Sequence, residues 1–438
     1  MKRIIYIFIP LLIILVGVLF YYKKNFSNTT SVKLITNTPL NKEGPSKDCN
    51  AEICYSLLQL INEARTSIDF AIYGLRGQNE ILQALVNAET RGVKVRGLVD
   101  KNIENENYYS DTHLIEKQLS NIKNDYFSDL KTAEYLKNNN KKNNKCERPK
   151  NTKGPLQCFE GKGYASKEEI YFQGDIMHNK FFIIDKKYVW TGSANISDTG
   201  IGGYNANLVA LMDSKFIAKF YTIEFNQMFI DGDFHRRKKK LKKEDIFTNI
   251  DGAEIGLYFS PQGYAMYRGV LPLIEEAEKT IDVSIFFLTH NNISRELVKA
   301  HKRGVKIRVI LDATAATNGY SKHNYLREHG IPVKVESWGG KMHMKAAVFD
   351  SKHLIVGSMN WTLAGERNND ENTIIIKNSP KHANQLSSFF NSMWESIPDK
   401  WLTKDPLPES IDSGSSCYDL IDNDFDKKID KKDEGCFN

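Results

Sequence analysis

Residues 61–73, Ile-Asn-Glu-Ala-Arg-Thr-Ser-Ile-Asp-Phe-Ala-Ile-Tyr, return in recognisable form as residues 274–286, Ile-Glu-Glu-Ala-Glu-Lys-Thr-Ile-Asp-Val-Ser-Ile-Phe. Each copy reads as the end of a helix that runs into a buried strand. A second helix follows in both copies and ends at Arg-Gly-Val-Lys, where the glycine predicts a left-handed C-cap. Another strand comes next and closes with Asp100 or Asp312. This order is typical of a βαβ unit, so we expect an α/β protein with two tandem units.

The composition sets limits on the class of protein. The 438 residues exceed one ordinary domain, and a hydrophobic fraction of 41% excludes wholesale disorder. A charged fraction of 26% excludes a polytopic membrane protein. The net charge of +6 is concentrated in two runs, residues 137–153 and 236–243, which hold seven basic residues each. The rest of the chain is net acidic.

The amino end predicts a membrane anchor. Residues 4–22 carry no charge, which is long enough for a helix that crosses a bilayer, and basic residues flank them on both sides. No small-x-small cleavage site follows. We therefore expect a retained, single-pass anchor in the cell membrane with the body of the chain outside the cytoplasm. The alternative is secretion after signal cleavage.

Six cysteines agree with export, because disulfides persist in oxidising compartments. They form three local pairs: Cys49 with Cys54, Cys146 with Cys158, and Cys417 with Cys436. Six cysteines allow 15 connectivities, and the sequence does not choose among them. Local pairing is the expectation because each pair brackets a polar segment that a disulfide would hold. Six reduced thiols are the alternative.

Both copies carry a His-x-Lys pair, followed by four residues and an Asp, and then Gly-Ser-x-Asn. These residues are His178, Lys180, Asp185, Ser193 and Asn195 in the first copy, and His343, Lys345, Asp350, Ser358 and Asn360 in the second. Residues i and i+2 of a strand share a face, so each His and Lys point the same way. A return strand then brings the Ser and Asn beside the Lys. Such a group of imidazole, ammonium, hydroxyl and carboxamide suits an oxyanion.

Each such cluster is half of a site. Two clusters related by approximate two-fold symmetry would place imidazoles on opposite sides of one phosphorus. One neutral histidine would attack while the other, protonated, would give its proton to the leaving oxygen. The two lysines would neutralise the phosphate, so no metal cofactor is expected for catalysis.

The duplicated motif resembles the HKD motifs of the phospholipase D superfamily, over roughly residues 50–400. The resemblance implies two phospholipase D-like units packed with pseudo-two-fold symmetry, and metal-independent phosphodiester hydrolysis or transfer through a phosphohistidine. By family habit His178 is the nucleophile and His343 the acid, and the motif aspartates are structural. In the second copy Glu371 is the carboxylate that orients a motif histidine. A gapless alignment places Ala206 at this position in the first copy, which leaves the choice of nucleophile open.

The tail is a separate module that resembles the Cys-bracketed, Asp-rich repeats of bacterial surface proteins. Its possible calcium ligands are Asp422, Asp424, Asp426, Asp430 and Asp433, at positions 1, 3, 5, 9 and 12 of a twelve-residue loop. We expect a structural calcium ion there. A solvated acidic tail is the alternative.

The expected organisation has six parts. They are a cytoplasmic tip and anchor (1–24), a linker (25–48), a first unit (49–234, with an insertion at about 101–176), a basic linker (235–252), a second unit (253–402) and the acidic tail (413–438). The insertion is expected to be a surface excursion that is either a solvated loop or part of a substrate entrance. A monomer is expected because both motifs lie in one chain.

Three functions remain open from the sequence. The anchor favours phospholipase D-type hydrolysis or transfer on phospholipids. An exported, membrane-anchored nuclease is the alternative, since the basic runs would suit a phosphate backbone. A non-catalytic surface protein that binds through its acidic tail is the third. The predicted catalytic residues are His178, Lys180, Ser193, Asn195, His343, Lys345, Ser358, Asn360 and Glu371.

Overall fold

The computed structural model describes residues 30–40, 43–138, 146–147, 157–159, 165–166, 172, 174–241 and 247–437. The predicted anchor at residues 4–22 lies outside these ranges. Within them, no helix is long and apolar enough to cross a bilayer.

The first unit is built on a seven-stranded mixed sheet with the order β1-β12-β10-β9-β2-β4-β5. Its strands are β1 (Ser31–Asn37), β2 (Ser67–Ile72), β4 (Lys94–Val99), β5 (Ile122–Asn124), β9 (Lys180–Ile184), β10 (Tyr188–Gly192) and β12 (Asn207–Asp213). β2, β4 and β5 are parallel, β9 pairs antiparallel with β2, and β10, β12 and β1 follow in turn, each antiparallel to its neighbour. The predicted βαβ unit, β2-α3-β4, is therefore confirmed and lies toward the β5 edge of the sheet.

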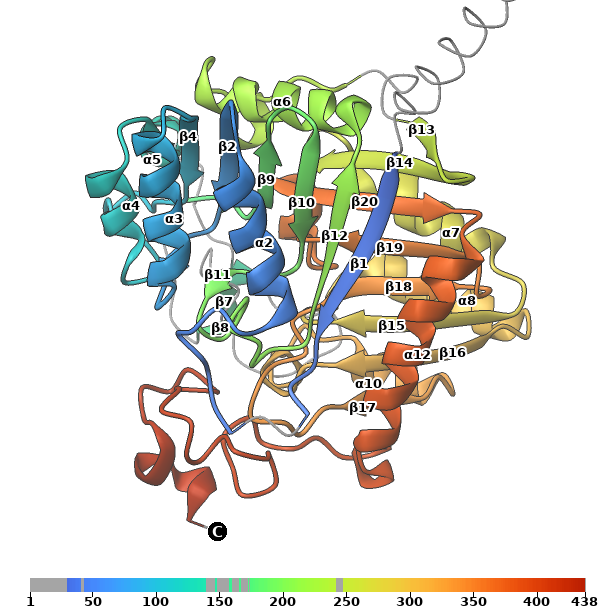
Figure 1. The fold of residues 1–438 in the computed structure, drawn as a ribbon. Coiled ribbons are helices and arrows are strands. Elements are labelled where there is room, and N and C mark those ends of the chain that lie inside the picture. The colour runs from blue at the N-terminus through green and yellow to red at the C-terminus, as the bar shows by residue number, and fades with distance from the viewer. Residues whose placement is uncertain are drawn as a thin grey trace, which may run out of the picture.

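The second unit repeats this sheet with one extra edge strand, in the order β13-β14-β20-β19-β18-β15-β16-β17. Its strands are β13 (Phe247–Ile250), β14 (Ala253–Ser260), β15 (Thr280–Ile285), β16 (Lys306–Leu311), β17 (Val333–Val335), β18 (Lys345–Phe349), β19 (His353–Gly357) and β20 (Glu371–Lys377). The two sheets cross in Figure 1, where the strands of the first run upright and those of the second run across the view.

The helices cover faces of the two sheets or lie in the connections between strands (Figure 1). They are α2 (Glu52–Glu63), α3 (Asn79–Thr90), α4 (Thr112–Gln118), α5 (Tyr126–Asn138), α6 (Lys215–Phe229), α7 (Leu271–Glu276), α8 (Asn291–Lys302), α9 (Ala313–Ala316), α10 (His323–Glu328), α11 (Leu363–Arg367) and α12 (Pro380–Ser396). Short strands β3 (Leu75–Arg76) and β11 (Ile196–Ser197) pair with each other, and β6 (Cys146–Glu147), β7 (Gln157–Phe159) and β8 (Ala165–Ser166) form a small sheet. Gly92 and Gly304 follow α3 and α8 with φ of 88° and 99°, as the C-cap prediction requires.

The repeat begins earlier than the sequence suggested. Matching the two strand orders makes β1 the counterpart of β14, and β1 lies in residues 25–48, which were predicted to be a linker. That prediction is wrong for residues 31–37. Val32 and Leu34 alternate with exposed residues and enter the core, as in a half-buried edge strand.

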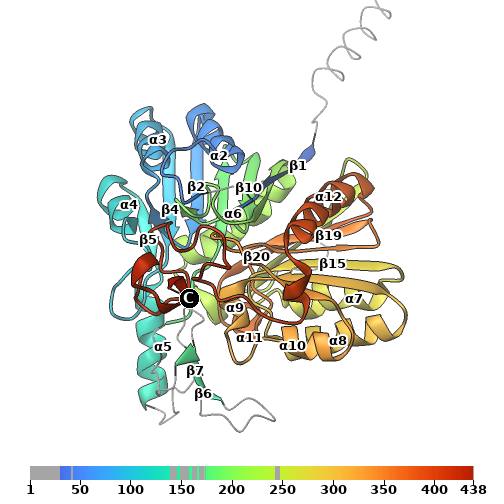
Figure 2. The same cartoon turned by 90° about the horizontal axis from the view of Figure 1, so that it is seen from below.

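The insertion is also shorter than predicted. α4 and β5 occupy the positions of α10 and β17, so the segment without a counterpart starts after β5, near residue 125. The first unit thus gains α5 and the small β6–β7–β8 sheet, which lie below the first unit in Figure 2.

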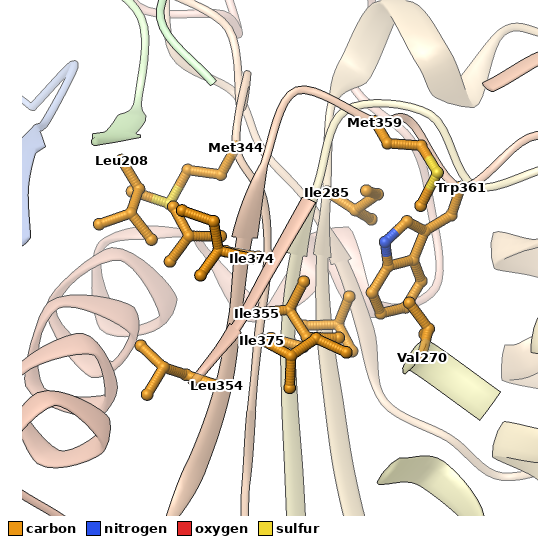
Figure 3. Close-up of a cluster of buried hydrophobic side chains, with 14 of the residues drawn as sticks. Leu208, Val270, Ile285, Met344, Leu354, Ile355, Met359, Trp361, Ile374 and Ile375 are labelled. Atoms are coloured by element: carbon orange, nitrogen blue, oxygen red, sulfur yellow. The ribbon is translucent and has the colours of Figure 1, made fainter. Parts of the chain in front are cut away.

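One hydrophobic core is continuous across both units. Leu208 of β12 belongs to the same buried cluster as Met344, the residue that follows the second motif histidine. Figure 3 shows these two side chains together, with Met359 and Trp361 on the other side of the cluster. Because Met359 and Trp361 are both buried, they hold the intervening Asn360 in a fixed position.

Two of the three predicted disulfides are confirmed: Cys49–Cys54 and Cys417–Cys436. For the third, the register of β6 and β7 sets Cys146 opposite Cys158, and the two side chains lie outside the described residues.

The segment predicted as a basic linker (235–252) is partly buried at its amino end. His235 is 4% exposed, and the Lys238 ammonium is fully enclosed between Glu224 and Asp370. The C-terminal tail lies across the junction of the two units (Figure 2). There Tyr204 donates its hydroxyl hydrogen to Asp419 at 2.6 Å.

Candidate active site

The first motif histidine sits where the two units meet. His178 lies two residues before Lys180, the first residue of β9. Its backbone N–H donates to the carbonyl oxygen of Asp370 in the second unit, at 2.9 Å, and Met177 forms an isolated parallel bridge with Asp370. The second unit therefore fixes the backbone beside this imidazole.

The second motif histidine is held reciprocally by the first unit. His343 lies two residues before Lys345 of β18, and its backbone N–H donates to the carbonyl oxygen of Ala206 at 3.0 Å. Ala206 in turn pairs with Met342. Each unit thus braces the histidine of the other, as a pseudo-two-fold interface should.

The ring partners of the two histidines differ in charge. Nδ1 of His178 lies 2.8 Å and 3.0 Å from the two carboxylate oxygens of Glu371. Nδ1 of His343 lies 3.1 Å from the carbonyl oxygen of Ser193 and 3.2 Å from Oδ1 of Asn207. The partners of His343 are acceptors, as Glu371 is when ionised. Nδ1 then carries the proton in both rings, and Nε2 keeps its lone pair.

The structural counterpart of Glu371 is Asn207, so the gapless alignment that placed Ala206 there is wrong by one residue. β12 begins at Asn207 and β20 begins at Glu371. The loop before β12 is one residue longer than the loop before β20. The second copy regains the register at Asn378, an extra residue with φ of 57° before α12.

The two motif serines do not line the cavity. Ser358 donates its hydroxyl hydrogen to Glu371 at 2.6 Å, and Ser193 donates to Asn207 at 2.9 Å. Both serines are at most 1% exposed. Their hydroxyls therefore orient the residues behind the imidazoles. The prediction that they contact a bound oxyanion is wrong.

The two motif lysines are buried and point toward the histidines of their own units. Nζ of Lys180 donates to the carbonyl oxygen of His178 at 2.9 Å, and Nζ of Lys345 donates to that of His343 at 2.8 Å. Burial lowers the pKa of Lys180 to about 7 and lowers that of Lys345 well below its usual value. Burial thus disfavours both ammonium charges, and a nearby anion would stabilise them.

Burial and these ammonium groups also act on the imidazoles. Burial lowers the pKa of His178 and of His343 well below the usual range, and the two lysines lower both further. Burial raises the pKa of Glu371 to about 8, and Lys180 opposes that rise. Neutral imidazoles are therefore favoured until an anion enters.

Aromatic rings flank both histidines. Tyr73 lies edge-on to His178 with 5.3 Å between ring centroids, and Phe286 is tilted against His343 at 5.0 Å. These two residues occupy equivalent places directly after β2 and β15, where each strand ends at the interface. Both residues were predicted to lie in strands, and nothing in the motif spacing shows that they reach the site.

The motif aspartates lie at the turns after β9 and β18, away from the cavity. Asp185 accepts hydrogen bonds from the backbone N–H groups of Arg65, Thr66 and Ser67. Asp350 accepts three equivalent bonds from residues 278–280. These contacts attach each hairpin to the loop before the central strand, as a structural role requires.

Both histidines line one cavity of about 600 Å³. Its wall includes Asn195 and Asn360, and it also includes residues that the motifs did not reveal. These are Tyr73, Arg76, Tyr108, Tyr109, Tyr204, Arg236, Phe286, Phe287, Tyr320, Lys341, Arg367, Ile421, Asn423 and Phe425, among others. Tyr108 and Tyr109 come from the predicted insertion, so part of that segment does border the cavity.

The C-terminal tail supplies one wall of this cavity. Nζ of Lys341 donates to the carbonyl oxygen of Asn423 at 2.8 Å and lies 4.4 Å from the ring centroid of Phe425. Thr314 donates to the same carbonyl at 2.8 Å. The tail is therefore attached to the residues just before the second motif.

Four of the five predicted calcium ligands lie close together in the tail. Asp424 is within metal-ligand distance of Asp422 and Glu409, and also of Asp426 and Asp433. Asp430 is turned away, since its Oδ1 accepts the backbone N–H groups of residues 419 and 420. Glu409, outside the twelve-residue loop, could not be found from the loop spacing.

Comparisons with known proteins agree with the motif. Residues 57–229 and 270–394 match the family model described as "Cardiolipin synthase, PLD-like domain". A mitochondrial cardiolipin hydrolase from Danio rerio is 36% identical over 153 residues, which cover 35% of this chain and 67% of the relative. A phospholipase D from Rickettsia prowazekii (strain Madrid E) is 30% identical over 144 residues, covering 33% and 70%. Of other curated relatives the chain spans little more than half the length, 56% in two cases.

A solved structure shows the same fold over most of the chain. The phosphatidylserine synthase from Haemophilus influenzae Rd KW20 aligns with a TM-score of 0.54 over 84% of this chain and 86% of its own. The sequences are 11% identical, so this likeness concerns the fold alone.

Proposed function

Because the chain belongs to the phospholipase D superfamily, whose PLD-like domain model matches most of it, we propose that it is a phosphodiesterase that acts through a phosphohistidine on phospholipids. The observation that carries the proposal is the pair of imidazoles in one cavity, each with Nδ1 engaged and Nε2 available. Members of the superfamily generally need no metal for this chemistry, and none has a part in the steps below.

The first step forms the covalent intermediate. Nε2 of His178 attacks the phosphorus with its lone pair, and the bond from phosphorus to the leaving oxygen breaks. The leaving oxygen takes the proton from Nε2 of His343. The ammonium groups of Lys180 and Lys345 stabilise the charge that gathers on the two free phosphoryl oxygens.

The second step reverses these roles. The now neutral His343 takes a proton from water, or from another alcohol in a transfer reaction, and the oxygen attacks phosphorus. The bond from phosphorus to Nε2 of His178 breaks, which returns the free imidazole and leaves His343 protonated for the next cycle.

The difference between Glu371 and Asn207 supports different roles for the two histidines. A carboxylate at Nδ1 makes the His178 ring more basic and stabilises the positive charge of its phosphorylated form. The amide of Asn207 gives His343 no such support, so protonated His343 is the stronger acid. This asymmetry supports His178 as nucleophile and His343 as acid.

The aromatic residues that line the cavity suit a lipid substrate. A separate observation favours a nuclease as the second candidate. Tyr73 and Tyr108 are stacked with centroids 5.1 Å apart, and Arg236 and Arg367 line the same cavity. Stacked rings beside guanidinium groups also suit a single-stranded nucleic acid.

Turnover assays separate these functions. The purified full chain is offered labelled phosphatidylcholine, phosphatidylglycerol and cardiolipin in mixed micelles, and in parallel end-labelled single-stranded DNA. We expect phosphoester cleavage in the lipid arm. Cleavage of DNA alone would replace the lipase with the nuclease, and turnover in neither arm would favour the surface-binding alternative.

We also propose a structural calcium ion in the tail, held by Asp422, Asp424, Asp426 and Asp433 with help from Glu409. Support comes from the convergence of these carboxylates on Asp424. Millimolar calcium should raise the Tm by about 3–8 °C, because an ion that binds only the folded state stabilises it. Asp424→Asn should remove this response, and Asp412→Asn, an exposed carboxylate nearby, should keep it. An unchanged Tm in the parent protein contradicts the calcium site.

For the regions that lie outside the described residues, we propose a retained anchor at residues 4–22, with the body exposed outside the cytoplasm. The absence of charge in this segment supports it. A monomer is proposed because one chain supplies both histidines.

A further inference from the structure

A second cluster of chemically reactive side chains lies beside the catalytic cavity and takes no part in the mechanism above. Asp125 precedes α5, Asp129 lies in its first turn, and His235 comes from the basic segment between the units. Asp125 and Asp129 are 0% exposed, and His235 is 4% exposed. One ligand atom from each lies within 4.8 Å of the others.

The spacing of these atoms is that of ligands around one ion. Nε2 of His235 lies 3.3 Å from Oδ1 of Asp129 and 3.4 Å from Oδ2 of Asp125. Ligands at the corners of a tetrahedron, each about 2.0–2.1 Å from a central zinc ion, are roughly 3.3 Å apart. These two distances are long for hydrogen bonds, and neither contact has hydrogen-bond geometry.

Oδ1 of Asp125 accepts the backbone N–H of Lys101 at 2.7 Å, but within the ranges that the structure describes the other carboxylate oxygens of the cluster lack hydrogen-bond partners. Among the described residues, neither carboxylate oxygen of Asp129 accepts a hydrogen bond, nor does Oδ2 of Asp125. Nε2 of His235 is likewise without one, whereas its Nδ1 faces Oδ2 of Asp370 at 3.1 Å. Buried polar groups are nearly always hydrogen-bonded, so an ion is the partner that this geometry lacks.

Charge points the same way. The nearest buried ammonium, Lys238, is already shared by Glu224 and Asp370. Within the described part of the chain, His235 is the only cationic group recorded within 4 Å of Asp125 and Asp129. Two buried carboxylates beside one imidazole are costly unless a cation neutralises them.

We propose that Asp125, Asp129 and His235 bind one divalent transition-metal ion, with zinc as the best fit to the donor set and spacing. Asp370 lies 3.1 Å from Nδ1 of His235, on the side away from the ion. A carboxylate at this position is the usual support of a metal-bound histidine.

The ion would brace the catalytic site without touching the substrate. Asp370 accepts the backbone N–H of His178 and immediately precedes Glu371 in the chain. A metal ion on His235 would therefore fix, through Asp370, the start of β20, where Glu371 contacts His178. Its role is structural, so the mechanism above stays independent of metal chemistry.

Metal content is the direct test. The full chain is purified without chelator, passed through gel filtration and measured by inductively coupled plasma mass spectrometry. We expect about one zinc ion per chain, less than a tenth of that in Asp129→Asn and His235→Gln, and a fall in Tm when EDTA strips the parent protein. Added zinc chloride should restore that Tm.

Glu336→Gln is the matched control, because Glu336 follows β17 as Asp125 follows β5 and is equally buried but hydrogen-bonded to backbone. This variant should keep its zinc whatever its Tm. If a variant of the cluster fails to fold, the zinc content and EDTA response of the parent still decide. A parent protein without bound metal, whose Tm does not respond to added zinc, overturns the proposal and leaves an imidazolium between two carboxylates.

Discussion

Replacing His178 with alanine is expected to lower kcat on any phosphodiester substrate by a factor on the order of 10⁵. The substitution removes Nε2, the nitrogen that we propose attacks the phosphorus, and no neighbouring group takes over this role. A substrate with a good leaving group, such as a p-nitrophenyl phosphodiester, should not restore turnover, because the missing step is bond formation. Steady-state assays on natural and activated substrates measure this.

His343→Ala should respond differently. It removes the acid, whose contribution is about 10²- to 10⁴-fold for a poor leaving group. A p-nitrophenolate leaves without a proton, so the first step should recover on the activated substrate while the second remains slow. A burst of p-nitrophenol followed by slow turnover is the expected result.

Folding must be checked in both variants. The exposed His329 offers a matched control, and His329→Ala should keep full activity. Far-UV circular dichroism and Tm should remain close to the parent values. Near-normal activity in His178→Ala or His343→Ala, with the fold intact, would contradict a shared site.

The second large effect is expected from Glu371→Gln, with opposite signs for activity and stability. The amide keeps the shape of the side chain but cannot stabilise a cationic His178 ring. We expect kcat to fall by about 10⁴-fold, as when the carboxylate behind a catalytic imidazole is replaced by an amide. Assays on the lipid substrate check this loss.

Stability should change in the other direction at alkaline pH. Burial raises the pKa of Glu371 from 4.5 to about 8, so the folded state holds a proton that the unfolded state has lost between these values. Its contribution to the free energy of unfolding therefore falls as the pH rises through this window. Glutamine does not titrate, so the stability of the variant relative to the parent should increase from pH 4.5 to pH 8.

Asn207→Asp is the matched control for this behaviour, because it places a titrating carboxyl at the equivalent position beside His343. Urea unfolding at several pH values should show a steeper loss of stability with rising pH in this variant than in the parent. A Glu371→Gln protein whose relative stability is constant or falls from pH 4.5 to pH 8 would refute the effect of burial on Glu371.

The sequence predicted the parts of the site that depend on local spacing. His178 and Lys180 point to the same side because they are two residues apart in an extended chain, and a hairpin then returns the Gly-Ser-x-Asn beside them. Repetition of this pattern also predicted the paired units. Local rules of this kind do not depend on distant parts of the chain.

Other features depend on contacts between distant segments. The match of Asn207 with Glu371 was missed because two differences cancel. The first copy has an extra loop residue before β12, and the second copy has Asn378 as an extra residue before α12. The motifs before these differences and the helices after them therefore align without gaps, although the strands between are shifted by one residue. The burial of Lys238 could not be predicted from the basic run, because the carboxylates that enclose it come from α6 and from the segment before β20. The tail looked like an appendage because nothing in its spacing shows that Phe425 reaches Lys341.

The central claim is that the phosphoryl group becomes covalently bound to the imidazole of His178 during turnover. Its most direct test is to mix His343→Ala with the p-nitrophenyl phosphodiester, quench under alkaline denaturing conditions that preserve phosphoramidates, and map the adduct by tandem mass spectrometry. We expect the added mass on the peptide that contains His178, and none when that residue is also replaced by alanine. An adduct on another residue, or turnover with no covalent species during a measurable burst, would contradict the account.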